Sequence, residues 1–217
     1  MMRIVLIGGG GHASDVLGVI EDRNDAGGID GQPITVVGIL DDHEIDGSRF
    51  AGRSVARIGS VADLAAVDAS HYVLAVGWPK SRRAIFDLLP ANGPAPASLV
   101  HPTATVGRGA TIGEGTVVMA GVHLSPLATV GRHACLSNHA VVGHDAVVGD
   151  FAGLMPAAVI SGGTNVGEGA LVGTNATVIE GVALGAWSTL GAGSVALADV
   201  GAGVVAVGSP ARPTTVG

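Results

Sequence analysis

Aromatic residues are scarce in this chain of 217 residues: they make up 3% of it, although 47% of the residues are hydrophobic. A core of this composition must be built from Val, Ile, Leu and Ala. With 36 glycines in addition, the composition is unusual for a helical or doubly wound protein. It suits a solenoid of short strands and tight turns.

Basic runs are also absent, and the formal net charge is −7. This balance argues against nucleic acid as the main partner, but it permits small anionic ligands. Cys135 is the only cysteine, so no disulfide can form within the chain. The apolar start, residues 1–11, is too short and too rich in glycine for a signal peptide or a membrane span. We therefore expect a cytoplasmic protein without a membrane span.

The first 97 residues alternate between strand and helix patterns. Strands are expected at 3–7, 35–40 and 72–76, and helices at about 13–21, 61–66 and 81–89. Strands that alternate with helices predict a small parallel sheet. Turn-forming residues at 90–96 predict a linker. We expect an α/β domain over residues 1–97 and a second domain over 98–217.

A six-residue repeat fills most of the second half. Every sixth residue from Val100 to Leu190 is aliphatic, sixteen positions in all, and glycine directly follows nine of them. A period of six matches neither a helix nor a two-sided strand, but it fits a coil with three flat faces and about 18 residues per turn. Residues i and i+18 should then stack about 4.8 Å apart. The aliphatic residues should point inward, with small residues at the corners.

A glycine-rich turn, Gly8 to Ala13, follows the first strand and begins the first helix. Its G-x-G-x-x-A spacing lets a pyrophosphate approach a helix N-terminus. Asp41 and Asp42 end the next strand, where an acidic residue would meet a ribose hydroxyl. The pattern alone would suggest NAD, but no dehydrogenase catalytic domain follows. A nucleotide diphosphate sugar suits a single unit of this size better.

The whole chain resembles one branch of the hexapeptide-repeat acyltransferases, the nucleotide-sugar acetyltransferases of the PglD and NeuD type. The resemblance runs from Ile7-Gly-Gly-Gly-Gly-His12, through the repeats, to Val207-Gly-Ser-Pro-Ala-Arg212. It implies a Rossmann-like domain that binds a nucleotide sugar, followed by a left-handed parallel β-helix. It also implies acetyl-CoA as the donor, no metal, and a homotrimer with coenzyme A between neighbouring subunits.

His144, in Val142-Gly-His-Asp-Ala-Val147, is the predicted general base. Acyl transfer to an amine or hydroxyl requires that the nucleophile lose a proton, and an imidazole suits this task. The pair resembles the family's His-Glu or His-Asp pair, so Asp145 is expected to orient the ring. Adjacent residues in a strand point to opposite faces, so their contact requires a corner. Gly162 lies one coil above His144, and its N–H is expected to face the thioester oxygen.

Further site residues follow from the resemblance. For coenzyme A they are Gly162, Ala192 and Arg212. For the nucleotide sugar they are Gly10, Gly11, His12, Asp41, Asp42, Gly77 and Arg82. Trp78 and Pro79 replace polar residues of the family's Gly-[Asp/Asn]-Asn motif, which leaves the identity of the nucleotide and sugar open. Trp187 is expected at a surface or an interface rather than against adenine.

Three alternative functions fit the same sequence. O-acetylation of a sialic acid would use the same base and donor as N-acetylation of an amino sugar. A non-catalytic nucleotide-sugar-binding protein would keep both domains. A zinc-dependent β-helix lyase is the third, because His139 and His144 are five residues apart. Zinc, however, needs at least three converging ligands, and Thr103 occupies the position of the third.

Overall fold

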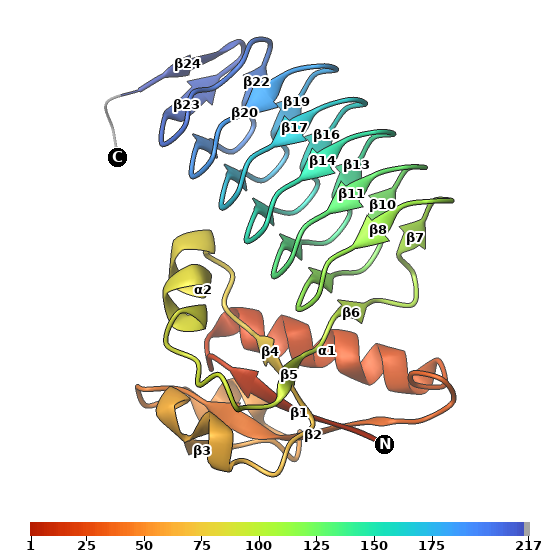
Figure 1. The fold of residues 1–217 in the computed structure, drawn as a ribbon, viewed down its shortest axis with the longest axis vertical. Helices are drawn as coiled ribbons and strands as arrows, with labels where there is room; N and C mark the ends of the chain where they lie inside the picture. Colours follow the sequence, from red (N-terminus) through yellow and green to blue (C-terminus); the bar gives the residue numbers. More distant parts are fainter. Residues whose placement is uncertain (215–217) are drawn as a thin grey trace.

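The N-terminal part of the chain is a five-stranded parallel sheet flanked by helices (Figure 1). The computed structural model describes residues 1–214, so the last three residues of the expected second domain lie outside it. The strand order is β3-β2-β1-β4-β5. The strands are β1 (Met2–Ile7), β2 (Ile34–Leu40), β3 (Arg57–Gly59), β4 (His71–Leu74) and β5 (Ala95–Pro96). The helices are α1 (Gly11–Asp25), α2 (Pro79–Phe86) and two 3-10 helices, η1 (Gly47–Phe50) and η2 (Val61–Ala66).

Some boundaries differ from the prediction. Helix α2 begins at Pro79 rather than at residue 81, because proline has the φ of the first helical position and needs no N–H there. Residues 95–96, expected within a linker, form the edge strand β5. Proline is tolerated at such an edge, since no further strand needs its missing N–H.

From Leu99 onward the chain winds into a parallel β-helix with three flat faces, each named here by its first strand. The β6 face contains β6 (Leu99–Val100), β9 (Val117–Val118), β12 (Cys135–Leu136), β15 (Gly153–Leu154), β18 (Leu171–Val172), β21 (Thr189–Leu190), β23 (Val205–Gly208) and β24 (Ala211–Pro213). The β7 face contains β7 (Thr105–Val106), β10 (His123–Leu124), β13 (Val141–Val142), β16 (Val159–Ile160), β19 (Thr177–Val178) and β22 (Val195–Ala196). The β8 face contains β8 (Thr111–Ile112), β11 (Thr129–Val130), β14 (Val147–Val148), β17 (Asn165–Val166) and β20 (Ala183–Leu184).

The predicted repeat is confirmed in every coil. All sixteen aliphatic positions are the second residue of a two-residue strand. Strand pairs join residues 18 apart, such as Leu136 with Leu154 and Val142 with Ile160. Small residues at the corners, Ala128 and Ala146 among them, are fully buried from the second coil onward.

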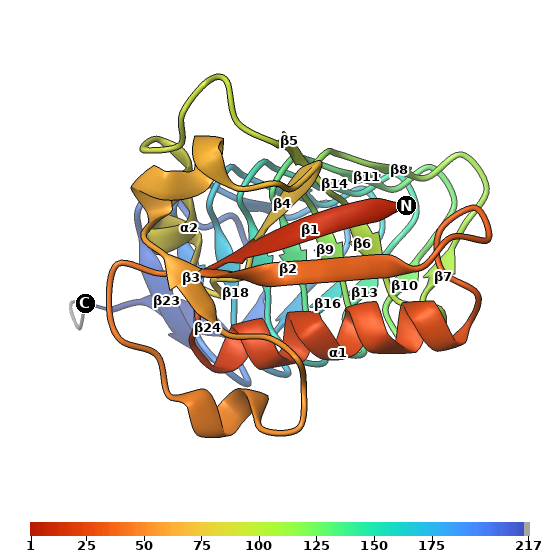
Figure 2. The same cartoon turned by 90° about the horizontal axis from the view of Figure 1, so that it is seen from below.

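The N-terminal domain packs against the β6 face. One core cluster joins Ala13, Val16 and Ile20 of α1 with Leu99 and Val117 of the β-helix. Figure 2 shows α1, β1 and β2 lying across the β-helix. The edge between the β7 and β8 faces is thus on another side of the β-helix from this packing. No helix among residues 1–214 is long and apolar enough to cross a membrane.

Candidate active site

His144 and Asp145 lie at the corner after β13, on the edge between the β7 and β8 faces. The backbone turns at Asp145, whose φ is 58°, so the two adjacent side chains meet. His144 Nδ1 lies 2.8 Å from Asp145 Oδ2, and the two side chains are 64% and 58% exposed. An Nδ1–H that donates to the carboxylate leaves Nε2 unprotonated. The predicted corner therefore produces the geometry that a general base requires.

Gly162 lies directly above the His144 ring, one coil farther along. A Cβ on residue 162 would stand 2.7 Å from both Cε1 and Nε2 of His144, so only glycine fits without a shift. The Gly163 N–H donates to the His144 carbonyl oxygen at 2.9 Å and holds the two coils in register. Within residues 1–214, no acceptor bonds to the Gly162 N–H. The Gly162 backbone therefore lies next to the His144 ring and keeps an N–H that is unbonded in the described part of the chain, the kind of donor that stabilises an oxyanion.

The glycine-rich turn after β1 borders a cavity of about 240 Å³. The Gly9 N–H donates to Asp41 Oδ2 at 2.7 Å, and the His43 N–H donates to Asp41 Oδ1 at 2.9 Å. Asp42 accepts from the Val61 N–H at 2.9 Å. The cavity is lined by Gly8, Asp41, Asp42, His43, Val61, Val76 and Ile85. The structure therefore brings both predicted acidic residues to the glycine-rich turn.

Gly10 and Gly11 stand where this turn meets α1. Among the described residues, a Cβ on Gly10 would meet no atom within 4 Å, and one on Gly11 would meet only Arg49 Nη1, at 3.6 Å. The space before the helix N-terminus is therefore open to a ligand. Gly77 lies close to α1, with its Cβ position 3.7 Å from Cγ of the His12 ring.

Arg82, a predicted nucleotide-sugar residue, lies instead between the two domains. Its side chain is 2% exposed, and its guanidinium donates five hydrogen bonds of 2.7–3.0 Å to backbone carbonyls of both domains. The acceptors are the carbonyl oxygens of Val76, Gly77, His133, Phe151 and Ala152. Because a guanidinium has five N–H groups, none is left for a ligand. The structure thus gives Arg82 a role that the sequence did not predict: it fastens the domains together.

His12 is part of the same interdomain contact. Its side chain is 17% exposed, and Nε2 lies 3.4 Å from Cys135 Sγ on β12. Burial, with a smaller contribution from the Arg82 charge, lowers the pKa of His12 to about 4. The ring is therefore neutral near pH 7, and its contacts are with protein atoms. In this structure His12 thus contributes to the interdomain contact, and its predicted role in substrate binding stays a prediction.

A second cavity, of about 250 Å³, was not predicted from the sequence. It opens between the beginning of α2 and the β6 face, and both tryptophans of the chain border it. It is lined by Trp78, Pro79, Lys80, Ser81, Gly169, Leu171, Trp187 and Thr189. Trp187 lies against Gly169, where a Cβ would collide with the indole. The sequence held one signal of this arrangement, since Gly169 precedes Trp187 by 18 residues.

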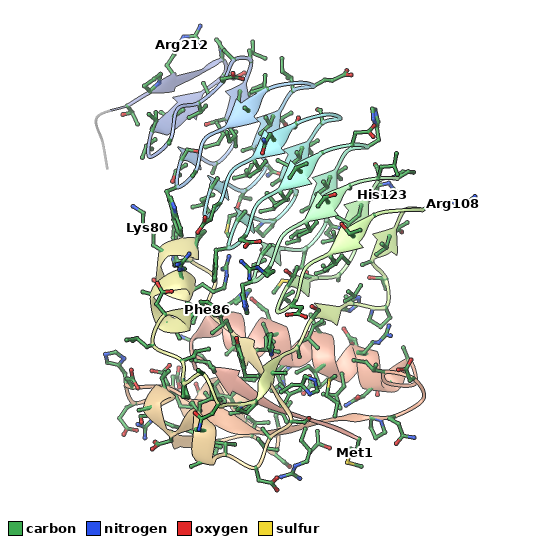
Figure 3. The ribbon with its side chains drawn as sticks, viewed as in Figure 1. Met1, Lys80, Phe86, Arg108, His123 and Arg212 are labelled. Carbon is green, nitrogen blue, oxygen red and sulfur yellow. The ribbon has the colours of Figure 1, made fainter. Side chains whose placement is uncertain are left out.

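The two remaining predicted coenzyme A residues lie apart from Gly162 within one chain. Ala192 is exposed at the corner between the β6 and β7 faces, a different edge from that of Gly162. Arg212 lies on β24, and its Nη1 donates to the Ala211 carbonyl oxygen at 2.9 Å. Figure 3 shows Arg212 at the far end of the β-helix from the N-terminal domain. A single chain therefore does not gather all three residues into one groove.

The histidines of the zinc interpretation are also separated. His139 lies at the corner after β12 and His144 at the corner after β13, so they stand on different edges. Within residues 1–214, no group of three or more His, Cys, Asp or Glu side chains is arranged to hold a metal ion. The spacing of five residues thus does not bring these two rings together.

Comparisons with known proteins agree on both domains. A family profile of the PglD N-terminal domain matches residues 3–89. The structure of PerB from Caulobacter crescentus, in complex with CoA and GDP-perosamine, is 33% identical, with a TM-score of 0.85 over 99% of this chain and 98% of that one. The acetyltransferase domain of PglB from Neisseria gonorrhoeae, in complex with acetyl coenzyme A, is 30% identical, with a TM-score of 0.84 and 98% of each chain covered.

A more distant structure, WeeI from Acinetobacter baumannii, shares the fold at 22% identity, with a TM-score of 0.82 over 99% of this chain and 100% of that one. The search of curated protein sequences found no match. Similarity to the PerB and PglB structures extends over both the sheet domain and the β-helix. The chain therefore belongs to the PglD and NeuD type of nucleotide-sugar acetyltransferases, which are acyltransferases with a left-handed parallel β-helix.

Proposed function

We propose that this chain transfers the acetyl group of acetyl-CoA to the amine of a nucleotide-linked amino sugar. One observation of the structure carries the proposal: the His144–Asp145 pair lies beneath the bare backbone of Gly162. The PerB structure, which holds CoA and GDP-perosamine, supports the substrate classes, as does the PglB domain with acetyl coenzyme A.

In the proposed mechanism, the acceptor amine attacks the thioester carbonyl carbon directly. His144 Nε2 takes the proton that the amine loses, and Asp145 holds the ring in the required tautomer. The Gly162 N–H donates to the oxyanion of the tetrahedral intermediate. When the carbon–sulfur bond breaks, the imidazolium returns the proton to the leaving thiolate of coenzyme A. No covalent acyl-enzyme is needed, and Cys135 is buried in the interdomain contact.

The cavity beside the glycine-rich turn is the proposed nucleotide site. Gly10 and Gly11 leave room for a diphosphate at the beginning of α1, and Gly77 lies nearby. Asp41 and Asp42 stand where they meet hydroxyl groups of the nucleotide. His12 and Arg82 are omitted from this site because their polar atoms serve the interdomain contact.

The active unit that we propose is a homotrimer in the cytoplasm, where acetyl-CoA is available. In one chain the nucleotide cavity belongs to the domain packed on the β6 face, whereas His144 lies on the edge between the β7 and β8 faces. Two copies can bring a nucleotide cavity and a His144 corner to the same acceptor. Coenzyme A would then lie between neighbouring subunits, with Ala192 and Arg212 supplied by the subunit next to Gly162.

An assay of free coenzyme A release tests this function. Wild-type protein is mixed with acetyl-CoA and a panel of nucleotide amino sugars, free amino sugars and sialic acids. We expect turnover with a nucleotide amino sugar, and an N-acetylated product by mass spectrometry. Turnover only with a sialic acid would establish O-acetylation instead. Binding of nucleotide sugars without any coenzyme A release would point to a non-catalytic protein.

A further inference from the structure

Along the edge of the β-helix that carries His144, charged side chains of opposite sign lie on the two sides of this histidine. Equivalent corner positions of five successive coils hold Arg108, Pro126, His144, Gly162 and Glu180. Backbone hydrogen bonds keep this column in register: the Leu127 N–H donates to the Arg108 carbonyl oxygen at 3.2 Å, as the Gly163 N–H does to that of His144 at 2.9 Å. At about 4.8 Å per coil, Arg108 and Glu180 each lie about 9.6 Å from His144 along the column, on opposite sides.

The Arg108 side chain is free to bind a ligand. It is exposed, and its guanidinium has no ion pair or hydrogen bond within residues 1–214. Figure 3 shows it pointing away from the β-helix. Arg132, on another corner, is instead held by Asp150 at 2.7 Å. Glu180 is likewise exposed and forms no ion pair in the described part of the chain. The column therefore presents an uncompensated cation on one side of His144 and an uncompensated anion on the other.

We propose that Arg108 of one copy binds the acceptor diphosphate that lies at the beginning of α1 of the neighbouring copy, and thereby places the acceptor on the N-terminal side of His144. The inference rests on the proposed function, because it requires an acceptor that carries a diphosphate. In such a molecule the diphosphate is attached at one end of the sugar ring, so an amine at Nε2 leaves it within reach of an arginine two coils away. A charge-assisted, bidentate contact is the interaction that arginine makes best with phosphate oxygens.

The opposite side of His144 suits the donor. Gly162, Gly163 and Gly181 expose bare backbone there, and Glu180 repels a diphosphate. The pantetheine arm of acetyl-CoA is uncharged, so it passes this carboxylate without a Coulomb penalty. Between His144 and Arg108, by contrast, the Leu127 side chain is 59% exposed and offers an apolar surface to the sugar ring. Charge and shape thus give the same order of acceptor and donor along the column.

Steady-state kinetics of Arg108→Gln tests the inference. We expect the KM for the nucleotide amino sugar to rise roughly tenfold to a hundredfold, while kcat and the KM for acetyl-CoA stay near wild type. Arg108→Lys should recover part of the loss, because it keeps the charge without the bidentate geometry. Arg23→Gln is the charge-matched control, since Arg23 also has no ionic partner in residues 1–214 but lies on α1. It should leave both KM values unchanged.

A second acceptor separates diphosphate binding from general effects. With the free amino sugar, which lacks the diphosphate, wild type and Arg108→Gln should have equal kcat/KM. An unchanged KM for the nucleotide sugar in Arg108→Gln would overturn the inference and leave the proposed function intact. A parallel rise in the KM for acetyl-CoA would also overturn it. If the wild type itself releases no coenzyme A with any acceptor, the proposed function fails, and this inference fails with it.

Discussion

In the β-helix the neighbours of each residue follow from an 18-residue register, whereas in the N-terminal domain contacts join segments without a fixed spacing. Gly162 lies above His144 because the coils repeat. Arg82 meets Phe151 and Ala152 only because the N-terminal domain packs against the β-helix. The proposed catalytic corner is therefore a local product of the repeat, whereas the contact of Arg82 and His12 with the β-helix depends on packing between the domains.

The largest expected effect is a loss of activity from a substitution in the β-helix. Replacing His144 with Ala should lower kcat by roughly 10²–10⁴, because the proton of the acceptor amine loses its acceptor. The substitution lies at an exposed corner, so the fold and the affinity for acetyl-CoA should be unchanged. Asp145→Asn should lower kcat by a smaller factor, since the imidazole remains in place. Near-normal turnover by His144→Ala would refute its role as the base.

The next largest effect is a loss of stability from a substitution in the interdomain contact. Arg82→Met should reduce the free energy of unfolding by about 3 kcal/mol, because several buried carbonyl groups lose their donors together. Arg83→Met is the matched control: Arg83 also bridges the domains, through Glu168, but it is 41% exposed and should contribute less than about 1 kcal/mol. Chemical denaturation of both variants measures the difference. Equal losses would contradict a special role of the buried guanidinium.

The positions of residues within the β-helix can be predicted from the sequence, whereas those of residues in the interdomain contact cannot. All sixteen strand positions of the β-helix, the corner at Asp145 and the column of Gly162 over His144 could be predicted, because a strict period fixes both spacing and direction. The glycine-rich turn and Asp41 were predictable as a motif of adjacent elements. The places of His12 and Arg82 were not, because their partners on the β-helix lie 51 to 123 residues away. The cavity between the two tryptophans depends on the same docking.

A smaller effect concerns acid stability of the interdomain contact. Burial is the main cause that lowers the pKa of both His12 and His133 to about 4, against 6.5 in the unfolded chain. The unfolded state therefore binds these protons first, and stability is lost as the pH falls from about 6.5 toward 4. Each ring contributes on the order of 3 kcal/mol or less over that window.

Unfolding free energies of His12→Gln between pH 4 and 7 check this contribution. The variant should show a shallower decline than wild type. His43, whose side chain is 91% exposed, supplies the control, and His43→Gln should leave the decline unchanged. An unaltered slope in His12→Gln would mean that its ring does not resist protonation in the folded state.

Subunit complementation tests most directly the central claim that a repeat corner of one copy serves the nucleotide cavity of another. His144→Ala removes the base, and Gly10→Val places a side chain in the open space at the beginning of α1, where the diphosphate is proposed to bind. Each variant alone should be inactive. Co-expressed in equal amounts and purified through two different tags, they should regain about a third of wild-type activity, because each mixed trimer has one interface in about three that pairs two intact halves. Mixed trimers without activity would contradict the account.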